Sequence, residues 1–289
     1  MWNPADPVVS SDDVRTCGAE CSIVDCRFDL ARPDWGRQEF LEAHVPGARY
    51  AHLDHDLADL AISRHGRHPL PDTRATLRLL GRLGVEPNRP LVVYDQGAGA
   101  IAARLWWMAR DAGHHESYLM DGGFAHWLAA GHPVESGPCT YSASSYPGHR
   151  GHMPTISIEN LAAALESHNV ILVDARDGRR YAGIEEPIDR IPGHIPGAVN
   201  IPFKNNIGAD GLWRSAAQIA ADWGHVHGVD LSANTPIVMS CGSGVTACHN
   251  IAALTRCGVR STLFAPSYSG WLEQENPRVA TGSESLRDY

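Results

Sequence analysis

Short apolar runs alternate with longer amphipathic segments along the whole chain. Four-residue runs at Leu91–Tyr94, Val170–Val173 and Ile237–Ser240 predict buried strands, and shorter strands are expected at Val8–Val9 and Ile23–Asp25. Helical spacing of apolar positions predicts helices in five segments: Thr73–Leu83, Ala100–Ala112, Ile158–Ser167, Ala216–Trp223 and Val245–Cys257, the last ended by Gly258. This alternation indicates an α/β protein with a parallel sheet covered by helices on both faces.

The pattern occurs twice, so the chain is predicted to be a duplication. Ile23–Arg27 is similar to Leu172–Arg176, His44–Ala48 to His194–Ala198, Pro90–Asp95 to Pro236–Cys241, and Trp127 to Trp271. Between the halves, His132 to Pro154 is rich in proline, glycine and serine and has no apolar period, as expected of a linker. We therefore predict a first domain over residues 1–135, a linker over 136–154 and a second domain over 155–289.

Composition excludes several classes of partner. The formal net charge is −9 without a cluster of lysine and arginine, so nucleic acid is not expected to bind. No apolar window is long enough to span a membrane, and the N-terminus lacks the pattern of a secretory signal. A cytoplasmic protein is expected, and a monomer, because the duplicated domains already form the interface that a dimer would supply.

The cysteines and histidines do not predict disulfides or a metal. Seven cysteines are an odd count in a chain predicted to be intracellular, which argues against a disulfide framework. Five of them are expected to be reduced and incidental: Cys17, Cys21, Cys26, Cys139 and Cys257. The sixteen histidines are scattered and match no ligand spacing, so no metal is expected.

Cys241 stands where a buried strand turns into a helix, the edge at which ligands bind to parallel sheets. Gly242 and Gly244 allow the backbone to curl so that successive N–H groups point inward, and the next helix adds the positive end of its dipole. Such a cradle favours a thiolate, which is the nucleophilic form of cysteine, and would also stabilise a persulfide. The duplicate carries Asp95 at this position, so we expect the first half to be an inert copy in which Asp95 is a structural cap.

These residues together resemble the two-domain rhodanese superfamily, through the repeated Val-Asp-x-Arg and His-x-Pro-Gly-Ala motifs and the cysteine loop. The heptapeptide Cys241–Ala247 is similar to the active-site loop of 3-mercaptopyruvate sulfurtransferases, and the resemblance runs roughly from Asp6 to Val279. It implies two tandem rhodanese-like domains and an enzyme that moves sulfur from 3-mercaptopyruvate to a thiol or cyanide through a Cys241 persulfide, releasing pyruvate. It implies no metal or organic cofactor, and thioredoxin or another thiol as the acceptor.

The resemblance also implies roles for residues that bind the donor. Arg180 matches the position that holds the donor carboxylate. A second arginine commonly follows a Glu-Pro pair in the family, but Ile188 follows Glu186-Pro187 here, which leaves Arg190 and Arg67 as candidates to replace it. The backbone of the loop would complete the donor site through Gly242, Gly244, Val245 and Thr246. Before Trp271 the family's Asp-Gly-Ser-Trp stretch is replaced by Ala265–Gly270, where Tyr268 is expected to supply an aromatic pocket wall.

For proton transfer, related enzymes are thought to use a Ser-His-Asp set. Ser243 matches the serine of the loop, and His68 in His68-Pro69-Leu70-Pro71 matches the histidine. Asp54 is the expected acidic partner, with Asp56 as a competitor. In such a set the carboxylate fixes the histidine tautomer and the histidine polarises the hydroxyl.

Three other functions are weighed against this one. Thiosulfate-using relatives place basic residues directly after the cysteine, whereas Gly242 and Ser243 are neutral, so thiosulfate is expected to react poorly. Phosphatases of related fold need an arginine six residues after the cysteine, where this chain has Ala247. A non-catalytic binding protein of the same fold would have no need of the intact Cys-Gly-Ser-Gly loop.

Overall fold

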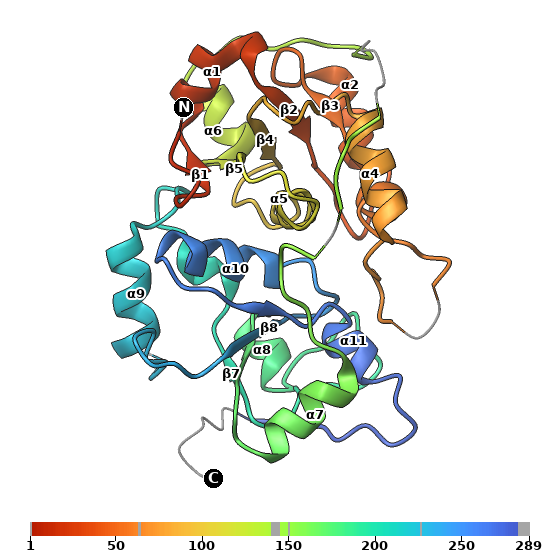
Figure 1. Ribbon diagram of the computed structural model, residues 1–289, viewed down its shortest axis with the longest axis vertical. Helices are drawn as coiled ribbons and strands as arrows, with labels where there is room; N and C mark the ends of the chain where they lie inside the picture. The colour runs from red at the N-terminus through yellow and green to blue at the C-terminus, as the bar shows by residue number, and fades with distance from the viewer. Residues whose placement is uncertain (1, 63–64, 140–144, 150, 226, 283–289) are drawn as a thin grey trace. The chain divides into compact units, whose positions relative to one another are not determined.

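The computed structural model describes the chain except for residues 1, 63–64, 140–144, 150, 226 and 283–289. The chain divides into two compact units (Figure 1). The first unit contains Met1–Asp59, Leu70–Met153 and Ile207–Trp213, and the second contains Leu60–Pro69, Pro154–Asn206 and Arg214–Tyr289. Each half of the chain therefore lends a short segment to the other unit, whereas the sequence predicted two continuous domains.

The first unit is built on a parallel five-stranded sheet in the order β1-β5-β4-β2-β3. Its strands are β1 (Val8–Val9), β2 (Ser22–Asp25), β3 (Arg49–Tyr50), β4 (Leu91–Tyr94) and β5 (Ser117–Met120). All four residues of β2, β4 and β5 are buried. Strands covered on both faces are nearly all apolar, which is why these runs do not alternate with polar residues.

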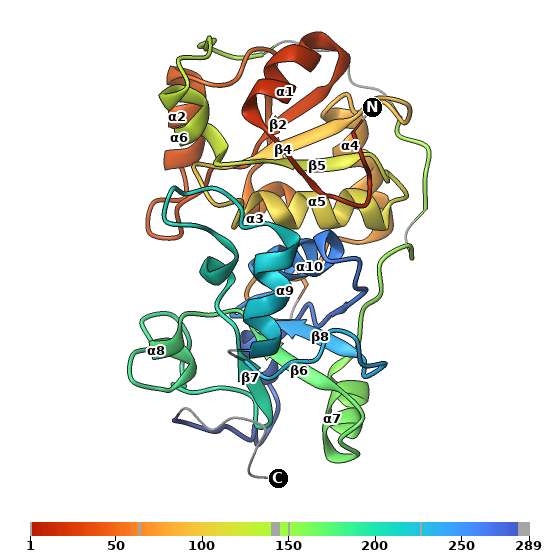
Figure 2. The same ribbon diagram turned by 90° about the vertical axis from the view of Figure 1, so that its left-hand side faces the viewer.

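Helices cover both faces of this sheet (Figure 2). On one face lie α1 (Ser11–Cys17), α2 (Trp35–Glu42) and α6 (Gly123–Ala129), whose Val14, Phe40, Phe124 and Trp127 form one core cluster with the strands. On the other face α5 (Ala102–Asp111) packs on β4 and β5, and α4 (Thr73–Arg82) packs on α5. The short helix α3 (Leu53–Asp56) follows β3.

The second unit repeats the plan with a parallel four-stranded sheet in the order β7-β6-β8-β9. The strands are β6 (Ile171–Asp174), β7 (Ala198–Asn200), β8 (Ile237–Ser240) and β9 (Thr262–Leu263). Helices α7 (Ile158–Glu166), α8 (Gly178–Tyr181) and α11 (Ser267–Trp271) share one core cluster with the sheet. Helix α10 (Ala247–Arg256) packs on β8 and β9, and α9 (Ala216–His225) packs on α10. The predicted α/β class is thus confirmed.

The internal repeat extends to buried polar contacts. In the first unit Arg27 donates to the carboxylate of Asp25 at 2.7 Å, and its guanidinium carbon lies 4.1 Å from the ring centroid of Phe124. In the second unit Arg176 likewise donates to the carboxylate of Asp174 at 2.7 Å, and its guanidinium carbon lies 4.1 Å from the ring centroid of Tyr268. These ion pairs lie at the carboxyl ends of β2 and β6, so they help to fix the edge at which the ligand site is expected.

One prediction about the cysteines is wrong. Cys17 and Cys21 form a disulfide instead of remaining reduced, because Cys17 ends α1 and the 3₁₀ turn Gly18–Glu20 returns the chain until the two Cα atoms are 5.9 Å apart. Cys26, Cys139 and Cys257 are not part of a disulfide, as expected. Within the described residues, no helix has both the length and the apolarity to cross a membrane.

Candidate active site around Cys241

The loop after β8 holds Cys241 in a tight backbone turn. Cys241 is 2% exposed, and the N–H of Gly244 donates to its Sγ at 3.1 Å. Gly244 has a φ of +77°, and a Cβ there would lie 2.3 Å from the carbonyl oxygen of Ala265. This position therefore needs glycine for both its conformation and its space. The turn over Gly242, Gly244, Val245 and Thr246 ends where α10 begins, which places the N-terminus of that helix beside the thiol.

Ser267 is a second contact of the cysteine, and the sequence patterns did not reveal it. Its Oγ accepts a hydrogen bond from the N–H of Cys241 at 3.0 Å and lies 3.9 Å from Sγ. Ser267 is fully buried at the start of α11 and has a φ of 52°, a left-handed conformation that is uncommon for serine. A strained residue of this kind carries no periodic signal in the sequence.

His68 and Ser243 are in direct contact. The Nδ1 of His68 lies 2.7 Å from the Oγ of Ser243, and the two residues are 4% and 7% exposed. His68 belongs to the segment Leu60–Pro69, which is part of the second unit although it comes from the first half of the chain. The segment is fixed to α11, because the N–H of Arg67 donates to the Oγ of Ser269 at 3.0 Å. A hydroxyl and an imidazole at this separation can pass a proton between them.

The expected acidic partner of His68 lies in the other compact unit. Asp54 is in α3, where its N–H donates to the Nδ1 of His52 at 3.1 Å, and its role toward His68 stays a prediction. Asp56, the competitor, accepts a hydrogen bond from the N–H of His52 at 2.7 Å and is paired with Arg82. These contacts give the Asp56 carboxylate a structural role at the end of α3.

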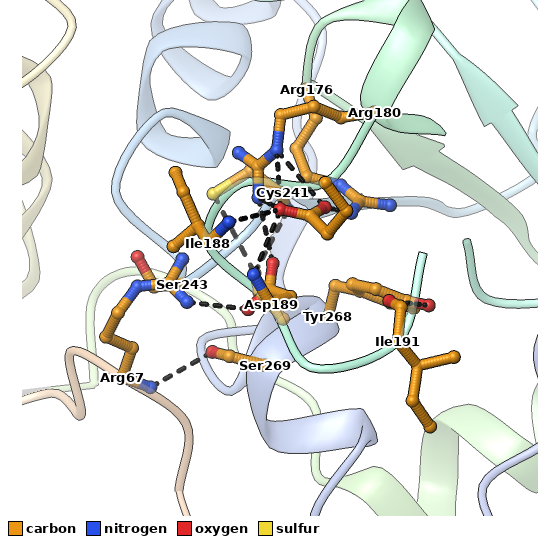
Figure 3. A network of polar contacts seen from close by, with 12 residues as sticks. Arg67, Arg176, Arg180, Ile188, Asp189, Ile191, Cys241, Ser243, Tyr268 and Ser269 are labelled. Atoms are coloured by element: carbon orange, nitrogen blue, oxygen red, sulfur yellow. Dashed lines mark hydrogen bonds and ion pairs between the residues drawn. The ribbon is translucent and has the colours of Figure 1, made fainter. Parts of the chain in front are cut away.

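Two of the three candidate arginines converge on the cysteine loop. A Cβ on Gly242 would lie 3.0 Å from Nη2 of Arg67 and 3.7 Å from Nη1 of Arg180, so both guanidinium groups stand over this glycine. Arg190 instead donates to the carbonyl oxygen of Leu272. Figure 3 shows Arg67 and Arg180 with Asp189, a residue that the sequence patterns did not single out.

Two carboxylates hold these arginines. Glu186 accepts from Nε and Nη2 of Arg180 at 2.8–3.2 Å and from Nη1 of Arg176 at 3.3 Å. Asp189 accepts from Nη1 of Arg67 at 2.6 Å and from Nη2 of Arg180 at 2.9 Å. Both carboxylate side chains are 2% exposed. Burial raises the pKa of Glu186, but the hydrogen bonds from Arg180 and from the backbone outweigh it, so the pKa lies below its usual value and the group is ionised.

Tyr268 does not line a pocket in the way the sequence suggested. It is fully buried beneath Arg176, and its hydroxyl donates to the carbonyl oxygen of Ile191 at 3.0 Å (Figure 3). Burial raises the pKa of Tyr268 to about 12, so the phenol stays protonated at neutral pH. Cys248 is also fully buried, and its Sγ donates to the carbonyl oxygen of Gly244 at 3.3 Å, so this side chain packs inside the fold at the start of α10.

No group of three or more His, Cys, Asp and Glu side chains in the described part of the chain is arranged to hold a metal ion. What the site brings together is a buried thiol, a hydroxyl–imidazole pair and two arginines.

Comparison with known proteins identifies relatives of the same fold. The family model for the rhodanese-like domain matches the chain twice, over residues 12–130 and 157–274. A probable 3-mercaptopyruvate sulfurtransferase of Pseudomonas aeruginosa is 38% identical over 90% of this chain and 92% of its own length. A putative thiosulfate sulfurtransferase of Mycobacterium tuberculosis is 33% identical over 92% of this chain and 93% of its own. The solved structure of 3-mercaptopyruvate sulfurtransferase from Leishmania major superposes with a TM-score of 0.81 at 32% identity, covering 92% of this chain and 74% of that one.

The fold and the site thus define a protein of two rhodanese-like domains with one cysteine loop. The chain belongs to the rhodanese family, and the family membership predicted from its sequence is confirmed.

Proposed function

We propose that the chain is a sulfurtransferase that moves sulfur from 3-mercaptopyruvate to a thiol or to cyanide through a persulfide on Cys241. The observation that carries this proposal is the buried Cys241 thiol, which accepts the N–H of Gly244 at 3.1 Å beside the first turn of α10. Peptide N–H groups and the helix N-terminus favour negative charge on that sulfur. The similarity to enzymes named 3-mercaptopyruvate sulfurtransferase supports the same reaction.

In the first half-reaction the Cys241 thiolate attacks the sulfur of the donor. A new S–S bond forms, the donor's C–S bond breaks, and the electron pair of that bond remains on carbon as pyruvate enolate. One proton then converts the enolate to pyruvate. In the second half-reaction a thiol or cyanide attacks the outer sulfur and regenerates the Cys241 thiolate, with thiocyanate as the product when cyanide is the acceptor.

The first unit supports the idea that such a loop holds an anion. There, the Asp95 carboxylate accepts four backbone N–H groups, from Gly97, Gly99, Ile101 and Ala102, at 2.8–3.3 Å. Cys241 follows β8 as Asp95 follows β4, and each leads into a helix. We infer that the cradle filled by the Asp95 side chain in the first unit serves a thiolate or persulfide in the second.

The proton for the enolate is assigned to the Ser243–His68 pair. A hydroxyl held 2.7 Å from an imidazole can donate its proton and recover one from the ring. Asp54 stays the proposed acidic partner that orients His68. Arg180 is assigned to the donor carboxylate, because its guanidinium stands over Gly242, next to the nucleophile.

A second candidate donor is thiosulfate, which one observation favours. The loop itself is neutral at Gly242 and Ser243, but Nη2 of Arg67 and Nη1 of Arg180 lie within 3.7 Å of the point where a Gly242 side chain would begin. Positive charge therefore reaches the loop from outside it. We still favour mercaptopyruvate, since two arginines match the planar carboxylate that this donor carries.

The acceptor and the assembly belong to the same proposal. Thioredoxin or another reduced thiol is the proposed acceptor, a monomer the proposed assembly, and the cytoplasm the proposed location.

Parallel assays of thiocyanate formation with mercaptopyruvate and thiosulfate test the proposal. Mercaptopyruvate is expected to have the higher kcat/KM, and Cys241→Ser is expected to abolish turnover of both donors. Mass spectrometry after donor alone should show one added sulfur atom on the wild type and none on the variant. Turnover by Cys241→Ser would refute the persulfide route, whereas faster turnover of thiosulfate would leave the route and replace the donor.

A further inference from the structure

A single carboxylate joins the two arginines that stand over the cysteine loop. Asp189 lies between α8 and β7 in the chain, and each of its two carboxylate oxygens binds one arginine. Oδ1 accepts from Nη1 of Arg67 at 2.6 Å, and Oδ2 accepts from Nη2 of Arg180 at 2.9 Å (Figure 3). The Asp189 side chain is 2% exposed, whereas Arg67 and Arg180 are 27% and 18% exposed. The carboxylate is thus enclosed, and the arginines reach from it toward solvent.

Both guanidinium groups also approach one place on the cysteine loop. Nη2 of Arg67 lies 3.0 Å from the position of a Cβ on Gly242, and Nη2 and Nη1 of Arg180 lie 3.6 Å and 3.7 Å from it. Nη2 of Arg180 is bound by Asp189 and Glu186, whereas Nη2 of Arg67 and Nη1 of Arg180 make no hydrogen bond within the described residues. Nε of Arg67 is buried and also lacks a hydrogen-bond partner in that part of the chain. Buried donors in native proteins are nearly always paired with protein groups or water, so this edge of Arg67 has a donor available to a bound anion.

We propose that Asp189 is a positioning residue that holds Arg67 and Arg180 as a two-arginine clamp for the carboxylate of the sulfur donor. Arg67 then takes the place of the arginine that the chain lacks at Ile188. One oxygen of the donor carboxylate accepts from Nη2 of Arg67 and the other from Nη1 of Arg180. The inference rests on the proposed function, because it assigns the carboxylate-binding part of that site.

Electrostatics explains why the clamp needs Asp189. Two guanidinium groups that approach the same point repel each other, and an anion between them removes most of that cost. Asp189 is itself fixed, since its N–H donates to Oε1 of Glu186 at 3.0 Å and Glu186 in turn binds Arg180. A residue anchored through both backbone and side chain is suited to hold partners in place. Such a residue is poorly suited to act as a plug, that is, to occupy the carboxylate site itself and leave it when the substrate binds.

The substitution Asp189→Asn distinguishes a residue that positions the arginines from one that occupies the substrate site, because the two predict opposite changes in KM. The asparagine keeps the shape, but its amide nitrogen faces one of the arginines with a donor, so one charge-assisted bond is lost. A positioning role predicts that KM for mercaptopyruvate rises about tenfold, with little change in kcat. If Asp189 were a plug, its removal would lower KM. A lower or unchanged KM overturns the proposal.

A sulfur donor that lacks the carboxylate separates loss of carboxylate binding from a general loss of structure, because only the former changes the preference between the two donors. Mercaptoacetone has the same ketone and thiol as mercaptopyruvate but lacks the carboxylate. The ratio of kcat/KM for mercaptopyruvate to that for mercaptoacetone should fall about tenfold in Asp189→Asn and in Arg67→Gln. An unchanged ratio in both variants, with slower turnover of both donors, would mean that the residues support only the fold.

The double variant tests whether Asp189 acts through Arg67. If it does, Asp189→Asn with Arg67→Gln should lose little more than Arg67→Gln alone, whereas independent roles would multiply the two losses. The matched control is Arg179→Gln, which removes the neighbouring arginine, exposed and paired with Glu185 at 2.6 Å. Its donor ratio should equal that of the wild type.

Failure of this inference can be told apart from failure of the proposed function. If wild-type protein gains no sulfur from mercaptopyruvate, the proposed function fails. If the wild type forms the persulfide but the donor ratio is the same in both variants and in Arg179→Gln, only the clamp fails. Thermal melts of each variant establish that it is folded, and Arg67→Gln, with a partly exposed side chain, supplies the test if Asp189→Asn does not fold.

Discussion

The Oγ of Ser243 lies 2.7 Å from the Nδ1 of His68, although 175 residues separate the two along the chain. The contact is possible because the segment Leu60–Pro69 folds with the second unit and is fixed to α11 by Arg67 and Ser269. The first half of the chain therefore supplies an imidazole and an arginine to the unit that holds Cys241.

Replacing His68 by Gln is expected to lower kcat with mercaptopyruvate by about 100-fold, the usual share of a general acid or base. Glutamine can still hydrogen-bond to Ser243 but cannot deliver a proton. Ser243→Ala should cost a similar factor, and the double variant little more, because both residues act on one proton. Single-turnover assays of pyruvate release measure this step. Equal rates in wild type and His68→Gln would remove the pair from the mechanism, and the effect of Asp54→Asn would decide whether Asp54 belongs to it.

Replacement by alanine should have very different effects on activity at the two glycines of the loop, Gly244 and Gly242. A Cβ at Gly244 would meet the backbone oxygen of Ala265 at 2.3 Å and would have to accept a φ of +77°, so Gly244→Ala should distort the loop and abolish persulfide formation. At Gly242 the nearest atom, Nη2 of Arg67 at 3.0 Å, ends a flexible side chain. Gly242→Ala should therefore keep kcat within a few-fold and mainly raise KM for the donor. Mass spectrometry of the persulfide and steady-state kinetics separate the two outcomes, and a fully active Gly244→Ala would contradict this account of the loop.

Asp95 is expected to matter for stability and not for sulfur transfer. Its carboxylate satisfies four backbone N–H groups in the loop before α5 and at the first residue of that helix, and asparagine has one acceptor oxygen in place of two. Asp95→Asn should lower the free energy of unfolding by about 2–4 kcal/mol, since unpaired buried donors cost about 1–3 kcal/mol each. Urea denaturation measures the change. The matched control is Asp34→Asn, at the exposed start of α2, where the side chain makes no capping hydrogen bond. It should change the free energy of unfolding by less than about 0.5 kcal/mol. Equal stability of the two variants would show that Asp95 is not a cap.

The fold was predictable wherever one rule of periodicity decided the structure. The runs at Leu91–Tyr94 and Ile237–Ser240 are buried strands because both faces of a parallel strand are covered, and such runs stand out in the sequence. Two-residue strands such as β3 and β9 are too short to have a period and exist through pairing with β2 and β8. The Cys17–Cys21 disulfide likewise depends on a 3₁₀ turn that no periodicity reveals.

For the site, sequence identified residues with distinctive chemistry and missed those that act through position. Cys241 and its glycines were visible as a strand-to-helix turn. Asp189 and Ser267 belong to common residue types. Asp189 is distinguished by its pairing with two arginines, and Ser267 by its left-handed backbone conformation. The sequence also left open the choice between Arg67 and Arg190, because it depends on which side chain reaches Gly242 and which reaches Leu272.

Stability should fall in mild acid because of His114, a buried imidazole whose Nδ1 lies 2.8 Å from the hydroxyl of Tyr146. Burial, with smaller contributions from His115 and Arg110, lowers the pKa of His114 to about 4. In the unfolded chain this histidine titrates near its ordinary pKa of about 6.5, so between the two values the unfolded state binds more protons than the native state. The stability that neutral His114 allows is therefore present above pH 6.5 and decreases as the pH falls toward 4, by about 1.4 kcal/mol per pH unit within that window.

His114→Gln removes the titrating group, so its free energy of unfolding should depend less steeply on pH than that of the wild type between pH 7 and 4.5. Urea denaturation at several pH values gives both slopes, and their difference isolates His114 from the other groups that titrate in the same range. His225→Gln, at an exposed position at the end of α9, serves as the control and should keep the wild-type slope. If His114→Gln and the wild type lose stability in parallel on acidification, the buried imidazole is not the group that limits the protein in acid.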